Sequence, residues 1–281
     1  MSSIEHQMTE IYCFVDDFLK AHPARALWRR SPHRRPRFTD SEVITIALLQ
    51  DCFGCATLKK AYELVRDNWG TAFPTLCSYQ QWLSRLHQLS GLVGELVRAV
   101  ALSLAEADNF YLMDSKPVPV CHPIRHGRVR LLREDGAYFG KSTKGWFFGF
   151  KLHLLAAERG HILGALLSPA NWDDRDPAPA LCGAVEGGAV LGDLGYRGEE
   201  FADAVLAEAE MLMLTPADGG RRGSPRRALL SSVRERIETT FSQLWTRFID
   251  RVCSRSWAGL WSTIKLKLLH YNLVHAGVLS V

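Results

Sequence analysis

The chain has 281 residues, of which 47% are hydrophobic and 10% aromatic, and its formal net charge is +4. This apolar content is enough to build a core and excludes an intrinsically disordered protein. The sequence shows no secretory signal at its start and no apolar run long enough to cross a bilayer. We therefore predict a cytoplasmic protein without a membrane partner, with its seven cysteines reduced. The length slightly favours two domains over one.

Residues 1–107 have the pattern of several short helices. Apolar residues recur at helical spacing from Ile4 and Met8 onward. A second helix is predicted to begin where Thr39 or Asp40 can cap its first turn. We predict an all-α N-terminal domain over this range, of the kind that binds nucleic acid or contributes to dimerisation.

The pattern changes over residues 108–281, where strands come first and helices follow. Strands are predicted around 109–121, 145–157 and 161–169, with a tight turn between the last two. Further along, two short strands alternate with helices, and two long helices complete the sequence. This order predicts an α/β domain with a mixed central sheet flanked by helices.

Three acidic residues stand out by their positions in these elements. Asp114 follows the apolar stretch Phe110–Met113, and Asp193 follows the apolar residues 189–191. Glu238 borders the apolar face of a predicted helix. If the two strands are central neighbours and the helix crosses them, all three carboxylates meet.

Three carboxylates without a neighbouring His or Cys suit a hard divalent ion such as Mg²⁺ or Mn²⁺. Two such ions are the usual device for in-line attack on a phosphodiester. Each acid also has an ordinary structural interpretation: Asp114 as a turn residue, Asp193 as a helix cap, and Glu238 as a partner of Arg234 at i−4. The spacing alone leaves both interpretations open.

Five stretches resemble a known family. They are MDSKPVPVC, KGWFFGFKLHLL, PANWDDR, GDLGYRG and RIETTFSQL, and they occur in that order within residues 38–275. In these stretches the sequence is similar to bacterial insertion-sequence DDE transposases with a ribonuclease H-like catalytic fold. More narrowly, it resembles the insertion-sequence family numbered nine-eighty-two.

The resemblance implies a catalytic and metal-binding triad of Asp114, Asp193 and Glu238, with two Mg²⁺ or Mn²⁺ ions per active site. It implies cleavage at the insertion-sequence ends, followed by transfer of the freed 3′-OH into target DNA. Related groups carry a Tyr, an Arg and a Lys around the Glu. Here Arg234 occupies the Arg place, whereas Ser231 and Trp245 stand in the other two. This departure leaves the triad intact and weakens any transfer of detail about how the helix contacts terminal phosphates.

Three basic segments are candidates to hold DNA. The first, 25–37, has six arginines and no acid; the second connects two strands; the third precedes the helix of Glu238. Solvated loops that bind nothing are the alternative for each segment. The predicted DNA-binding residues are Arg29, Arg30, Arg34, Arg35, Arg125, Arg128, Lys144, Arg221, Arg222, Arg226, Arg227 and Arg234.

The sequence thus predicts two domains, a helical DNA-binding or dimerisation domain over 1–107 and a ribonuclease H-like DDE catalytic domain over 108–281. The expected partners are the terminal inverted repeats of an insertion sequence and the target DNA. A homodimer is expected on DNA, because two ends must be paired, and the expected location is the nucleoid. The alternatives are a metal-dependent nuclease or resolvase of the same fold, and a catalytically silent DNA-binding protein.

Overall fold

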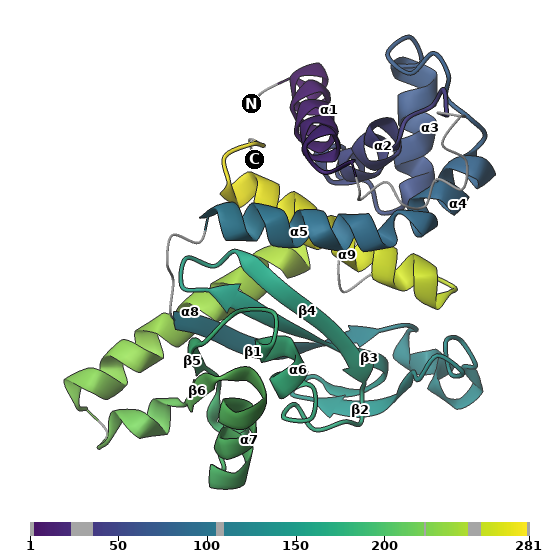
Figure 1. Cartoon of the computed structure of the whole chain (residues 1–281). Coiled ribbons are helices and arrows are strands. Elements are labelled where there is room, and N and C mark those ends of the chain that lie inside the picture. Colours follow the sequence, from purple (N-terminus) through teal and green to yellow (C-terminus); the bar gives the residue numbers. More distant parts are fainter. Residues whose placement is uncertain (1–2, 24–35, 105–109, 222, 247–253, 280–281) are drawn as a thin grey trace. The chain divides into compact units, whose positions relative to one another are not determined.

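The computed structural model describes residues 3–23, 36–104, 110–221, 223–246 and 254–279 (Figure 1). The chain divides into two compact units. One comprises residues 1–100 together with 257–281, and the other comprises residues 101–256. Within the described ranges, no helix combines the length and the apolar character needed to span a membrane.

The first unit is built from helices, as its sequence predicts. Thr39 begins α2 with a capping box, because its hydroxyl accepts from the Glu42 N–H and the Glu42 carboxylate accepts from the Thr39 N–H. Almost every residue of α2 is buried, so this helix is the centre of the unit. The helices are α1 (Ile4–Ala21), α2 (Asp40–Cys52), α3 (Leu58–Asn68), α4 (Tyr79–Gln88), the start of α5 (Ser90–Leu104) and α9 (Trp257–His275).

The last helix, α9, groups with the N-terminal helices and not with the residues that precede it. Its residues 266–273 are buried on every side, so the helix must be covered all round. Figure 1 shows α5 and α9 side by side, and the Asn272 side-chain amide donates to the Val97 carbonyl at 3.1 Å. The boundaries predicted for the second domain, 108–281, therefore differ from the compact unit 101–256.

The second unit contains a six-stranded mixed sheet in the order β2-β3-β1-β5-β6, with β4 also paired to β3. β1 pairs antiparallel with β3 and parallel with β5, and β5 pairs parallel with β6. This mixed sheet with flanking helices fits the predicted α/β fold of the ribonuclease H-like type. The strands are β1 (Phe110–Pro119), β2 (Tyr138–Ser142), β3 (Gly145–Ala157), β4 (Ile162–Pro169), β5 (Gly188–Leu191) and β6 (Met211–Leu214).

One strand, β2, lies within the basic connector between the first two predicted strands and was not predicted. It forms a hairpin with the start of β3, in which Phe139 pairs with Phe148. Its five residues include Gly140, and they alternate only weakly between apolar and polar types. The hairpin depends on tertiary contacts, such as the close approach of Gly140 to Ala170. The pattern of five residues does not predict such contacts.

Helices cover both faces of the sheet. Tyr111 and Met113 on β1 belong to the cluster that packs with α6 and α7. Residues at alternate positions point to the opposite face, where Lys116 meets Phe241 of α8. The helical segments of this unit are η2 (Pro123–Arg128), α6 (Ala178–Cys182), η3 (Leu194–Tyr196), α7 (Glu199–Ala209), η4 (Pro216–Gly219) and α8 (Pro225–Thr246), where η marks a 3₁₀ helix.

Candidate active site

Two of the predicted acids come together at one edge of the sheet. Leu112 of β1 is in register with Leu191 of the parallel neighbour β5. Asp114 and Asp193 each follow these leucines by two residues, so Asp114, within β1, lies level with the point where the chain leaves β5 at Asp193. The two carboxylates are close enough for the charge of Asp193 to raise the pKa of Asp114.

Asp114 lies on β1 and is mostly buried. Burial raises the pKa of its carboxyl to about 6, while the positive charge of Lys116 and the hydrogen bond from the Ser115 N–H oppose this shift. The Ser115 N–H donates to Oδ1 at 2.8 Å, and the Lys116 Nζ lies 3.8 Å from Oδ2. A carboxylate with a raised pKa beside a second acid is typical of functional sites.

Asp193 stands where β5 turns into a short 3₁₀ helix. Its Oδ1 accepts from the Gly195 N–H at 2.7 Å, which is the cap interaction that the sequence suggested as one alternative. The preceding residue, Gly192, has no room for a side chain, since a Cβ there would lie 2.6 Å from Cδ2 of Tyr196. The Gly192 backbone and the Tyr196 ring therefore fix the direction in which the chain leaves β5.

Glu238 comes from α8, which is anchored to the sheet by buried side chains, including Phe241 and Leu244. Its carboxylate lies 3.3 Å from the Arg234 guanidinium, so the predicted i−4 pair forms. The positive charge of Arg234 also lowers the pKa of Asp114, so this arginine acts on both acids. Glu238 remains about half exposed.

A cleft of about 530 Å³ lies beside these residues. Glu238 and Phe241 of α8 form one wall, and Lys116 of β1 joins them. The Lys116 ammonium lies 5.5 Å from the centre of the Phe241 ring. The β2–β3 hairpin contributes Lys144 and the exposed Trp146. The cleft therefore joins an acid, two cations and aromatic surface next to Asp114.

The donor set fits a hard divalent cation in its chemistry. Asp114, Asp193 and Glu238 offer only carboxylate oxygens, and all three belong to the same compact unit. Within the residues that the structure describes, however, no group of three His, Cys, Asp or Glu side chains is arranged to hold a metal ion. Asp114 and Asp193 are brought together, whereas Glu238 faces Arg234.

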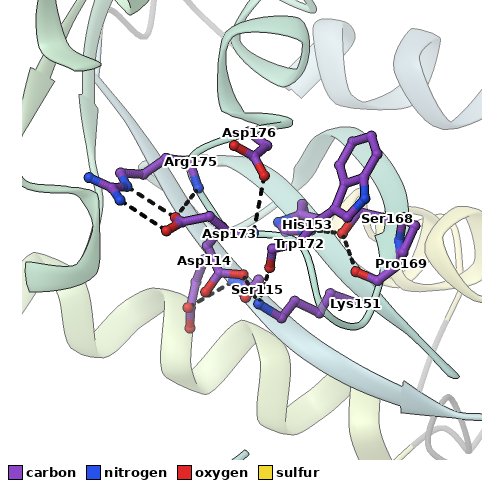
Figure 2. A network of polar contacts seen from close by, with 11 residues as sticks. Asp114, Ser115, Lys151, His153, Ser168, Pro169, Trp172, Asp173, Arg175 and Asp176 are labelled. Atoms are coloured by element: carbon purple, nitrogen blue, oxygen red, sulfur yellow. Dashed lines mark hydrogen bonds and ion pairs between the residues drawn. The ribbon is translucent and has the colours of Figure 1, made fainter. Parts of the chain in front are cut away.

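A polar network lies next to Asp114, between β3 and the loop that follows β4 (Figure 2). The Lys151 ammonium donates to the Trp172 carbonyl at 2.7 Å and lies 2.9 Å from Oδ1 of Asp174. His153, also on β3, is buried with Nε2 2.7 Å from the Ser168 hydroxyl, which marks it as a structural residue. Asp174 is thus held near the site by Lys151.

Tyr196, which sequence reasoning missed as a neighbour of the candidate site, is buried on the turn that also carries Asp193. Burial raises the pKa of its hydroxyl well above the usual value, and the charges of Asp174, Asp114 and Asp193 act in the same direction. The only signal in the sequence is its place in GDLGYRG, three residues after Asp193. An aromatic residue in such a short helix is usually interpreted as a core residue. The sequence pattern therefore gives no reason to assign Tyr196 a further role.

The predicted DNA-binding residues do not form one patch that the structure can describe. Arg125 and Arg128 on η2, Lys144 and Arg221 are exposed. Arg227 is half-buried and donates to the Gly220 carbonyl at 3.2 Å. Outside the described residues, or without a described side chain, lie Arg29, Arg30, Arg34, Arg35, Arg222 and Arg226.

Comparison with known proteins gives one match. The family described as "Transposase DDE domain" matches residues 104–249, just over half of the chain, and this range contains all three acids. No curated protein and no solved structure matches. The matched range includes β1 and β5, the strands that carry or precede Asp114 and Asp193. The match shows that the chain belongs to the transposase DDE domain family.

Proposed function

We propose that the chain is a transposase that cleaves DNA at insertion-sequence ends and transfers the freed 3′-OH into target DNA, with Asp114, Asp193 and Glu238 as its catalytic residues. The observation that carries the proposal is the pairing of β1 with β5, which brings Asp114 and Asp193 to one edge of the sheet inside the matched range. We further propose that the chain is a member of the family numbered nine-eighty-two.

The three carboxylates are proposed to hold two Mg²⁺ or Mn²⁺ ions. When bound, such ions activate the attacking hydroxyl and stabilise the leaving oxygen. Asp114 is suited to a central role because its carboxyl is mostly buried and lies 3.8 Å from the Lys116 ammonium. Arg234 is placed to hold Glu238 and to offer its remaining N–H donors to a phosphate oxygen.

The cleft beside Asp114 is proposed to receive the DNA strand. Lys116 and Lys144 supply positive charge to its phosphates, and the exposed Trp146 supplies apolar surface. Arg125, Arg128 and the other predicted basic residues are proposed as phosphate contacts around it. A homodimer on DNA is part of the proposal, because two ends must be joined in one event.

The test is nicking and joining of a labelled duplex that carries the ends of the element, with Mg²⁺ or Mn²⁺. Asp193→Asn keeps the size of the side chain but removes the charge. We expect the variant to bind the duplex and to nick it more than about 100-fold more slowly, because outer-shell changes alone cost 10–100-fold. Asp203→Asn, an exposed aspartate on α7, is the matched control and should act as the wild type does.

The products separate the alternatives. Nicked but unjoined DNA from the wild type would indicate a nuclease or resolvase. Binding without cutting by both the wild type and the Asp203→Asn control would indicate a silent DNA-binding protein. Equal nicking by the wild type and Asp193→Asn would contradict the assignment of Asp193.

A further inference from the structure

One large aromatic side chain of the second unit is left in solvent. Trp146, at the start of β3, is 63% exposed, whereas the next two residues, Phe147 and Phe148, are buried. Tryptophan is highly buried on average, because its indole ring carries a large apolar area. The core of this unit takes up the two phenylalanines and not Trp146, so the exposed ring requires another explanation.

The β2–β3 hairpin holds this ring on regular backbone. Trp146 is in register with Lys141 of β2. At the tip of the hairpin, the Ser142 hydroxyl donates to the Gly145 carbonyl at 3.2 Å and accepts from the Lys144 N–H at 3.2 Å. A ring on a hydrogen-bonded strand is already ordered, so little conformational entropy is lost when a ligand binds to it.

Trp146 lines the cleft of about 530 Å³ that Glu238 also lines. This volume is of the size that holds small molecules and cofactors, so the cleft has room for a nucleotide and not for a double helix. Lys116 and Lys144 line the same cleft, and Arg234 lies 3.3 Å from the Glu238 carboxylate and offsets its charge. Cations beside an exposed aromatic ring are the combination that binds single-stranded nucleic acid, because the cations contact phosphates while bases stack on the ring.

We propose that this cleft holds one unpaired nucleotide of the DNA end, whose base stacks on Trp146 while the Lys116 and Lys144 ammonium groups contact the neighbouring phosphates. The inference rests on the proposed function and adds to it the form of the DNA that the site takes. In a duplex both faces of a base are covered by its neighbours, so a base can stack on Trp146 only after it has left the stack. The cleft therefore distinguishes unpaired from paired DNA next to Glu238.

The experiment measures the binding of two dye-labelled DNA hairpins to the whole chain by fluorescence anisotropy, without divalent metal. One hairpin has a blunt end, and the other has the same stem with a short single-stranded tail of thymines. We expect the wild type to bind the tailed hairpin more tightly than the blunt one. Trp146→Ala should bind the tailed hairpin about tenfold more weakly, because the stacked base loses its ring, and should bind the blunt hairpin as the wild type does.

Trp146→Phe keeps an aromatic ring and should keep most of the affinity for the tailed hairpin. Tyr138→Ala is the matched control, because Tyr138 is an exposed aromatic residue of β2 that does not line the cleft, and it should bind both hairpins as the wild type does.

Three results would overturn the inference and leave the proposed function to the nicking assay. They are a wild type without preference for the tailed hairpin, equal affinities of wild type and Trp146→Ala for it, and an equal loss by Trp146→Ala on both hairpins. If the wild type binds neither hairpin, DNA as the partner fails and the inference fails with it.

Discussion

His153 shows how a single buried side chain on β3 sets an acid limit on stability. Burial lowers its pKa to about 4, from about 6.5 in an unfolded chain. Below pH 6.5 the unfolded chain therefore takes up a proton that the folded chain does not, and stability falls as the pH drops from about 6.5 to 4. The full effect is of the order of 3 kcal/mol.

We expect His153→Gln to lessen this loss, because glutamine does not titrate and can still bond the Ser168 hydroxyl. Urea unfolding at pH 7, 6 and 5 measures the difference, with the exposed His122→Gln as control. Asp114 has the opposite dependence, since its raised pKa makes the folded chain more stable as the pH falls from about 6 to 4. This contribution is common to all three proteins, so parallel curves for wild type and His153→Gln would contradict the prediction.

Among the elements, α8 matters most to the proposed site, because it places Glu238 in the cleft beside Lys116 only if the helix lies on the sheet. The Phe241 side chain is 1% exposed and supports the Lys116 ammonium. The helix amphipathicity seen in the sequence thus matters to the proposed function, since the residues that bury α8 also fix the position of Glu238.

We expect Phe241→Ala to destabilise the second unit by about 3–5 kcal/mol, because it leaves a cavity under α8. Nicking should fall as well, since Glu238 and Lys116 lose their common support. Urea unfolding and the nicking assay measure the two effects. Glu235→Ala, at an exposed position of the same helix, should change stability by less than about 0.5 kcal/mol. Unchanged stability of Phe241→Ala would contradict the packing of α8.

At the scale of the whole molecule, α9 near the end of the sequence belongs to the same unit as the N-terminal helices. Lys267 of α9 forms an ion pair with Asp51 of α2, and both side chains are almost fully buried. Removing one charge of a buried pair leaves the other uncompensated, whereas replacing both by apolar groups is often neutral.

We therefore expect Lys267→Met to destabilise the first unit by about 3–5 kcal/mol, and Asp51→Leu combined with Lys267→Met to recover most of this loss. Thermal unfolding measures both variants. Because the second unit keeps its own core, the temperature at which it unfolds should not change. A double variant as unstable as Lys267→Met would contradict the pairing.

The sequence by itself determined most of the elements and the candidate acids. Local pattern is enough for this: helical spacing is visible around α2, alternation around β3, and an acid after an apolar stretch at Asp114 and Asp193. The GDLGYRG and RIETTFSQL stretches also pointed to the transposase DDE family, which the match over residues 104–249 confirms.

Only the tertiary structure decided which distant residues meet. The register of β1 with β5 places Asp114 and Asp193 at the same level of the sheet. In the same fold, Glu238 forms an ion pair with Arg234. α9 groups with the N-terminal helices and is buried on every side, and a sequence pattern does not show which surface will cover such a helix. The sequence also does not show that the Tyr196 hydroxyl is buried without a hydrogen-bond partner, since burial and hydrogen bonding are properties of the folded chain.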